Sequence, residues 1–151
     1  MNIVLDTNAL LMAISAKNVY HTVWLSFLRG EYTLCNTNEI IDEYLEVISR
    51  NINTIVAEKI VAAILNRENT TKLDPHFRFN LIEEDKDDNK FVDCAIAGNA
   101  SYIVTEDHHF NVLKKIKFPP ISVIGIDEFI IILNSYDNMM LNESELKYGN
   151  Q

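Results

Sequence analysis

Short apolar runs alternate with segments of helical periodicity along this chain, and few folds accommodate that pattern. The runs at 3–5, 32–35, 102–105 and 121–126 have the length of strands, and each precedes a segment whose apolar residues recur every three or four positions. Consecutive parallel strands need a crossover connection, usually a helix, and such helices cover both faces of the sheet. The sequence therefore predicts an α/β fold with helices on both faces of a central parallel sheet.

Helix boundaries between these runs follow from capping and turn residues. Asn36 and Glu39 have the spacing of a capping box, which predicts a helix through about residue 49. Asn53 or Thr54 begins another helix, which ends near residue 66. The remaining predicted helices cover 8–15, 19–28, 90–100, 109–116 and 127–133.

Two segments depart from this alternation. Residues 67–90 are polar and charged and read as a connection, with one short strand predicted at 79–82. The polar segment 134–151 is predicted to be a loosely held tail, although Met139 to Leu141 are apolar enough to dock on another surface. We therefore expect one domain over 1–133 and a tail, which could be flexible, over 134–151.

Composition narrows the class of protein. The chain has 151 residues, of which 48% are hydrophobic and 23% charged, enough for the core of one domain. No apolar run approaches the roughly 18 residues of a membrane-spanning helix, and the first residues lack the basic leader and cleavage site of an exported protein, so we expect a cytoplasmic location. Cys35 and Cys94 stand in apolar surroundings without metal-binding spacing, which predicts reduced core thiols.

The net charge of −9 is unfavourable for a nucleic-acid binder, because lysine and arginine supply most non-specific affinity for phosphate. Carboxylates that bind divalent cations would reverse this local field. An acidic surface also suits a basic protein partner.

Acidic residues occur where functional groups gather in open α/β sheets, outside the carboxyl ends of the strands. Asp6 ends the first predicted strand, and Asp107 follows the strand at 102–105 after one intervening residue. Asp88 stands at the start of the predicted helix before that strand, and a helical wheel places it on the apolar stripe of this helix. Glu43 is the acid nearest the apolar stripe of the helix after Asn36.

Each of these acids alone has an ordinary explanation, as a helix N-cap for the three aspartates and as a boundary residue for Glu43. Four inward acids from four segments would repel one another, so their convergence favours bound cations. A ligand set of oxygens alone selects Mg²⁺ or Mn²⁺ rather than zinc. The histidines are scattered or lie in turns, and we assign them loop roles: His21, His76, His108 and His109.

Four segments together resemble PIN-domain ribonucleases, and most closely the PIN-family toxins of bacterial toxin–antitoxin pairs: "IVLDTNALL", "NEIIDEYLEVI", "DDNKFVDCAIAGNASYIVTEDHHF" and "ISVIGIDEFI". The resemblance runs from residue 2 to about residue 133. It implies a PIN-like, Rossmannoid fold, a three-layer α/β/α sandwich with a central, mostly parallel sheet. The chain departs from the family pattern at Glu106, where these proteins usually carry glycine.

The resemblance also implies roles for individual residues. The catalytic, metal-binding acids would be Asp6, Glu43, Asp88 and Asp107. Supporting residues would be Asn8, Asp93 and Thr105. Lysines near these acids are candidates for contact with a substrate phosphate: Lys90, Lys114, Lys115 and Lys117.

The activity implied by the resemblance is cleavage of RNA phosphodiesters by a water that bound Mg²⁺ or Mn²⁺ activates. The implied partners are RNA, a small antitoxin protein and a second copy of the chain in a homodimer. One alternative is a phosphatase of the haloacid dehalogenase type, but that chemistry needs a second aspartate two residues after Asp6, where this chain has Asn8. Another is a PIN-like binding module without catalysis, which the presence of all four acids disfavours.

Overall fold

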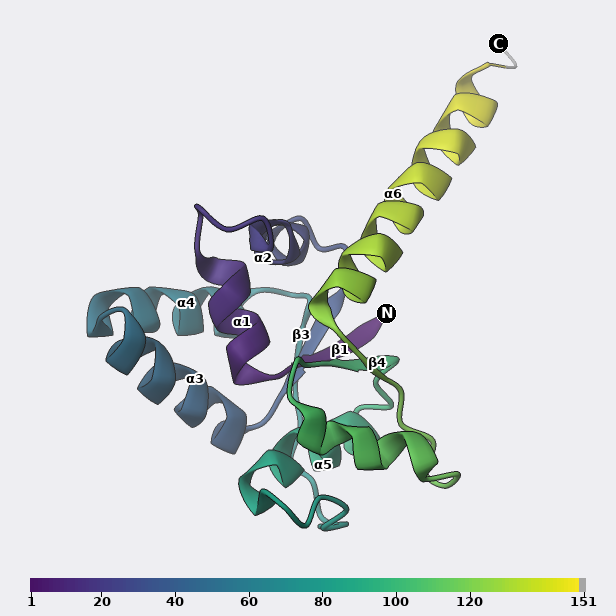
Figure 1. Ribbon diagram of the computed structural model, residues 1–151. Helices are drawn as coiled ribbons and strands as arrows, with labels where there is room; N and C mark the ends of the chain where they lie inside the picture. Colours follow the sequence, from purple (N-terminus) through teal and green to yellow (C-terminus); the bar gives the residue numbers. More distant parts are fainter. Residues whose placement is uncertain (150–151) are drawn as a thin grey trace.

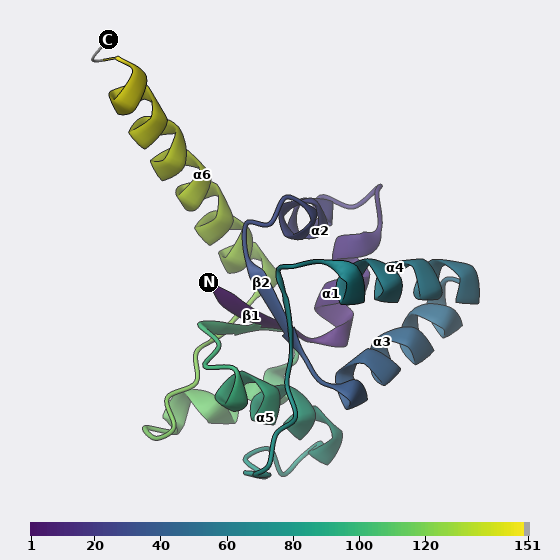
Figure 2. The same cartoon turned by 180° about the vertical axis from the view of Figure 1, so that it is seen from behind.

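A five-stranded sheet in the order β3-β2-β1-β4-β5 forms the centre of the molecule (Figures 1 and 2). The structure is a computed structural model that describes residues 1–149. All neighbouring strands pair in parallel, which confirms the predicted fold class. The strands are β1 (Asn2–Leu5), β2 (Thr33–Asn36), β3 (Thr70–Lys72), β4 (Tyr102–Val104) and β5 (Val123–Ile124).

Helices cover both faces of this sheet. α1, α3 and α4 lie on one side, and α5 lies on the other, where it contacts β1, β2 and β4 (Figure 1). The α-helices are α1 (Thr7–Ile14), α2 (His21–Leu28), α3 (Asn38–Asn51), α4 (Thr54–Asn66), α5 (Asn89–Ala97) and α6 (Ile126–Tyr148), and the 3₁₀ helices are η1 (Lys86–Asp88) and η2 (His108–Lys115).

The core lies on both sides of the central strand. Ile3, Val4 and Leu5 of β1 are all buried, which is why this strand reads as an unbroken apolar run. At the start of α6, Phe129 packs edge-on against Tyr32, with ring centroids 5.1 Å apart. Tyr44 of α3 donates its hydroxyl to the Leu5 carbonyl at 2.6 Å, which ties this helix to the end of β1.

The strand predicted at 79–82 is wrong, and the sheet takes β3 (Thr70–Lys72) instead. β3 is an edge strand whose side chains are largely exposed, so it carries no apolar signal. At 79–82, side chains rather than a neighbouring strand satisfy the backbone. Phe79 donates its amide to Asp93, and Asn89 both accepts from the Ile82 amide and donates to its carbonyl.

Helix starts agree with the sequence in one case and differ by one residue in another. Asn53 caps α4 by accepting a hydrogen bond from the amide of Val56 at 2.8 Å, as expected. The cap of α3 is Thr37, whose hydroxyl accepts from the amide of Ile40, whereas Asn36 is the buried last residue of β2. The predicted cap at Asn36 is therefore wrong, because the strand continues for one residue more.

Beyond residue 133 the chain is helical rather than irregular, because α6 continues to Tyr148. This half of α6 projects from the rest of the molecule (Figures 1 and 2), and Met139, Met140 and Leu141 are exposed. Residues 150–151, the end of the predicted tail, lie outside the described residues. Within residues 1–149, even α6 does not combine the length and the apolar character needed to cross a membrane.

Candidate functional site

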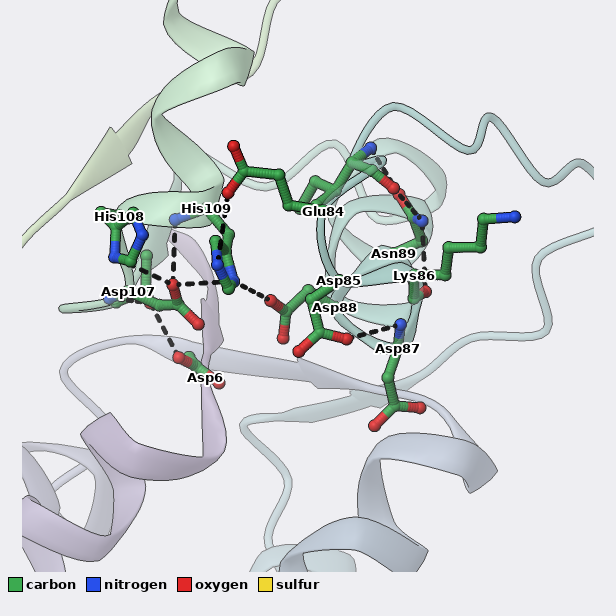
Figure 3. A network of polar contacts seen from close by, with 12 residues as sticks. Asp6, Glu84, Asp85, Lys86, Asp87, Asp88, Asn89, Asp107, His108 and His109 are labelled. Atoms are coloured by element: carbon green, nitrogen blue, oxygen red, sulfur yellow. Dashed lines mark hydrogen bonds and ion pairs between the residues drawn. The ribbon is translucent and has the colours of Figure 1, made fainter.

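Two predicted site residues meet at the carboxyl ends of neighbouring strands. Asp6 follows β1, and Asp107 follows β4 after two residues. Thr105 links them, since its hydroxyl donates to Asp6 Oδ2 at 2.7 Å and accepts from the Asp107 amide at 3.0 Å. Figure 3 shows both carboxylates at this edge of the sheet. Parallel pairing of β1 with β4 therefore brings together acids that are far apart in sequence.

Asp6 is buried, with 5% of its surface exposed. Burial raises the pKa of Asp6, and the negative charges of Glu43 and Asp107 raise it further, against the hydrogen bond from Thr105. A carboxylate in this position is costly to ionise. A bound cation would remove most of that cost.

Glu43 reaches the same end of the sheet from α3. One of its carboxylate oxygens accepts a hydrogen bond from the hydroxyl of Thr7, and the other lies 2.8 Å from Lys90 Nζ. Only 9% of the Lys90 side chain is exposed, and its ammonium also lies 2.9 Å from Asp87. Burial acts to lower the pKa of Lys90, but its hydrogen bonds to Glu43 and Asp87 outweigh burial and raise it. Lys90 therefore acts as the counter-ion of Glu43.

Asp88 enters the site from the end of η1. Burial, together with the charges of Asp85, Asp107 and Asp6, raises the pKa of Asp88 to about 7. Its Oδ2 atom lies 3.6 Å from Nδ1 of His109, and that same nitrogen lies 3.3 Å from Asp107 Oδ1 (Figure 3). His109 thus stands between two of the predicted catalytic acids.

These contacts of His109 are ones that the sequence does not predict. Asp107 caps the turn after β4 by accepting from the His109 amide at 2.9 Å, and this turn directs the imidazole toward η1. A position two residues after a strand-end acid was the only sequence signal for this placement. The contact with Asp88 depends on how two distant segments pack.

The four predicted acids surround one end of the sheet without forming a single tight ligand set. Within residues 1–149, the sets of three or more such side chains whose ligand atoms all lie within 4.8 Å are Glu84–His108–His109 and Asp85–Asp88–His109. Of the four acids, only Asp88 belongs to one of these sets. Thr105 bridges Asp6 and Asp107, and His109 lies between Asp88 and Asp107, whereas Glu43 acts on Asp6 through its charge.

The predicted supporting residues have different surroundings. Thr105 is buried between the two strand-end acids, as described above. Asn8 is exposed at the second residue of α1, close in sequence to Asp6. Asp93 is buried, and its contact is with the backbone of Phe79 in the long connection.

Three of the predicted phosphate-contacting lysines are exposed: Lys114, Lys115 and Lys117. Lys115 lines a groove of about 510 Å³ together with Glu84, His108 and His109. This groove gives one lysine a path to the acidic site. Lys90, by contrast, is already paired with Glu43.

Glu106, the residue at which the chain departs from the family pattern, has a structural role. Its Oε1 accepts a hydrogen bond from the amide of Ile126 at 2.7 Å, at the first residue of α6. The partial positive charge of a helix N-terminus stabilises a carboxylate there. Glu106 therefore caps α6.

A parallel sheet with carboxylates at the ends of adjacent strands defines an α/β protein with an acidic site at its strand edge. A family model described as "PIN domain" matches residues 2–109, and the chain belongs to this family. This match confirms the resemblance seen in the sequence.

A solved structure shows the same fold. One similar structure is the crystal structure of VapBC2 from Rickettsia felis bound to a DNA fragment from their promoter, with 18% identity, a TM-score of 0.58, and coverage of 83% of this chain and 98% of that chain. Another is the T. brucei RRP44 PIN domain, at 11% identity and a TM-score of 0.49, with coverage of 93% and 85%. Among curated protein sequences, none matches the chain significantly.

Proposed function

We propose that this PIN-domain protein is a metal-dependent endoribonuclease and the toxin of a toxin–antitoxin pair. The observation that carries the proposal is the convergence of Asp6, Asp88 and Asp107 at one strand edge, where burial and neighbouring negative charges raise the pKa values of Asp6 and Asp88. Such a group of carboxylates is suited to holding a divalent cation. The family match favours nuclease chemistry over the phosphatase alternative.

The cation would be held by Asp6, Glu43, Asp88 and Asp107. When bound, Mg²⁺ or Mn²⁺ supplies an activated water and neutralises charge on the scissile phosphate. Thr105 orients the Asp6 carboxylate through a hydrogen bond to Oδ2, and Thr7 and Lys90 hold the two oxygens of Glu43. Lys115 lines the adjacent groove, and we expect it to contact the RNA backbone.

The partner we propose is a small antitoxin with a basic side chain that enters the acidic site. The net charge of −9 supports this complementarity. We also propose a cytoplasmic location and, from the sequence resemblance, a two-fold homodimer, which light scattering after size exclusion would detect. Growth arrest on expression, relieved by the adjacent open reading frame, would distinguish a toxin from a housekeeping nuclease.

Cleavage of total RNA with end mapping tests the activity. We expect cleavage with Mg²⁺ or Mn²⁺, products with 5′-phosphate and 3′-hydroxyl ends, and loss of activity in Asp6→Asn. Asp42→Asn is the matched control, because Asp42 is exposed on α3. Full activity in EDTA or in Asp6→Asn would refute the mechanism, and RNA binding without cleavage would support the binding module instead.

A further inference from the structure

We propose that His109 is a nitrogen ligand of the divalent metal, in a subsite that it forms with Asp85 and Asp88. Ligand atoms of these three residues lie within 4.8 Å of one another. They come from two segments, η1 with the residue before it and the turn after β4, which Figure 3 shows facing each other. This inference rests on the proposed metal site and adds a residue to it.

Two polar atoms in this subsite lack partners. Nδ1 of His109 and Oδ2 of Asp88 are both shielded from solvent, and neither has a hydrogen-bond partner among residues 1–149. They lie 3.6 Å apart, which is too far for a hydrogen bond. Adjacent buried polar atoms without partners are costly, and a cation between them would satisfy both.

The separations suit a shared metal. Ligand atoms about 2.1 Å from one ion stand roughly 3–3.5 Å apart in octahedral or tetrahedral geometry. Nδ1 of His109 lies 3.3 Å from Asp107 Oδ1 and 3.6 Å from Asp88 Oδ2. Asp88 also shares with His109 and Asp85 a set of ligand atoms that all lie within 4.8 Å of one another, and small adjustments of these three side chains would bring them onto one ion.

The other imidazole nitrogen supports the same assignment. Nε2 of His109 lies 3.3 Å from Glu84 Oε2. A carboxylate behind the ring favours the proton on Nε2 and leaves the lone pair of Nδ1 directed at Asp88. Histidines that bind metals commonly have such a carboxylate partner, which fixes the tautomer and the orientation of the ring.

An imidazole ligand changes the expected metal. Mg²⁺ prefers oxygen ligands, whereas nitrogen ligands suit Mn²⁺ better and Co²⁺ better still. The sequence alone predicted a ligand set of oxygens only and did not separate Mg²⁺ from Mn²⁺. With His109 in the set, we expect Mn²⁺ to bind more tightly than Mg²⁺.

Titration calorimetry of the full chain with Mn²⁺ and with Mg²⁺ measures this preference. We expect His109→Gln to weaken Mn²⁺ binding by tenfold or more while Mg²⁺ affinity changes by less than about threefold. Glu84→Gln, which keeps the imidazole but removes its carboxylate partner, should weaken Mn²⁺ binding by less. His76→Gln is the control, because His76 is exposed in the long connection.

Pulsed electron paramagnetic resonance of the Mn²⁺-loaded protein gives a direct readout. We expect the nitrogen coupling of a bound imidazole in wild type and in His76→Gln, and its loss in His109→Gln. Mn²⁺ bound with no nitrogen coupling in wild type would overturn this inference and leave the metal-dependent nuclease standing. Failure of wild type to bind any divalent metal would overturn both, and thermal melts of each variant exclude misfolding as the cause.

Discussion

Replacing Asp88 with asparagine should stabilise the metal-free protein at alkaline pH, although it removes a proposed metal ligand. Burial and neighbouring charges raise the pKa of Asp88 from 3.8 to about 7, so the fold favours the protonated side chain. For such a group, the contribution to stability is complete below the unfolded pKa and is lost as the pH rises through the folded pKa. Asparagine mimics the protonated acid at every pH and avoids that loss.

The magnitude follows from the two pKa values. Their difference corresponds to a loss of at most about 4 kcal/mol once the pH is well above 7. At pH 5 the unfolded chain is already ionised while the folded Asp88 is not, so wild type has lost only about 1–2 kcal/mol. The stability advantage of Asp88→Asn should therefore grow by about 2–3 kcal/mol between pH 5 and pH 8, or roughly 4–12 °C in Tm.

Urea and thermal unfolding in EDTA at the two pH values measure this advantage. Asp42→Asn, on the exposed face of α3, should show no comparable growth. Added Mn²⁺ should reverse the order, because it stabilises the folded wild type and binds the variant less. An advantage that is constant with pH, or a variant less stable than wild type at pH 8, would refute this electrostatic account of the site.

Two further substitutions test the surroundings of the site. Glu106→Ala removes the cap of α6 and should cost about 1 kcal/mol in thermal unfolding while leaving Mn²⁺ affinity in calorimetry unchanged; weaker Mn²⁺ binding would contradict the structural role. Lys90→Met keeps the aliphatic stem but leaves Glu43 without its counter-ion, and should cost about 1–3 kcal/mol in urea unfolding. Adding Glu43→Gln should recover most of that loss, and additive effects in this double-mutant cycle would contradict the pairing.

The sequence predicts the buried strands correctly, because a strand that is buried on both faces consists of apolar residues. β1 and β4 are central and covered on both faces, so both strands are visible in the sequence as apolar runs. β3 lies at the edge, and its Thr-Thr-Lys sequence joins the sheet through backbone pairing with β2. At 79–82, Ile82 is buried without a neighbouring strand, and no local pattern distinguishes this segment from a strand.

The site shows the same division between local and long-range information. Asp6 and Asp107 are predictable, because parallel strands place their carboxyl ends at one edge. The position of His109 against Asp88 depends on the packing of the turn after β4 against η1, and the cap that Glu106 supplies depends on where α6 begins. Neither contact corresponds to a fixed residue spacing, so neither can be predicted from the sequence.

Lys90 and His109, the two basic side chains of the site, lie beside different acids. Lys90 neutralises Glu43, so this acid is balanced before any metal arrives. Within residues 1–149, no lysine pairs with Asp6 or Asp88, and burial and neighbouring negative charges raise the pKa values of both. A divalent cation gains most where a positive charge is missing, so we expect the first ion to bind at Asp85, Asp88 and His109 rather than at Glu43. Glu43 would bind the metal only if it gave up its ion pair with Lys90. Lys90 therefore holds Glu43 in position and also competes with the metal for its carboxylate.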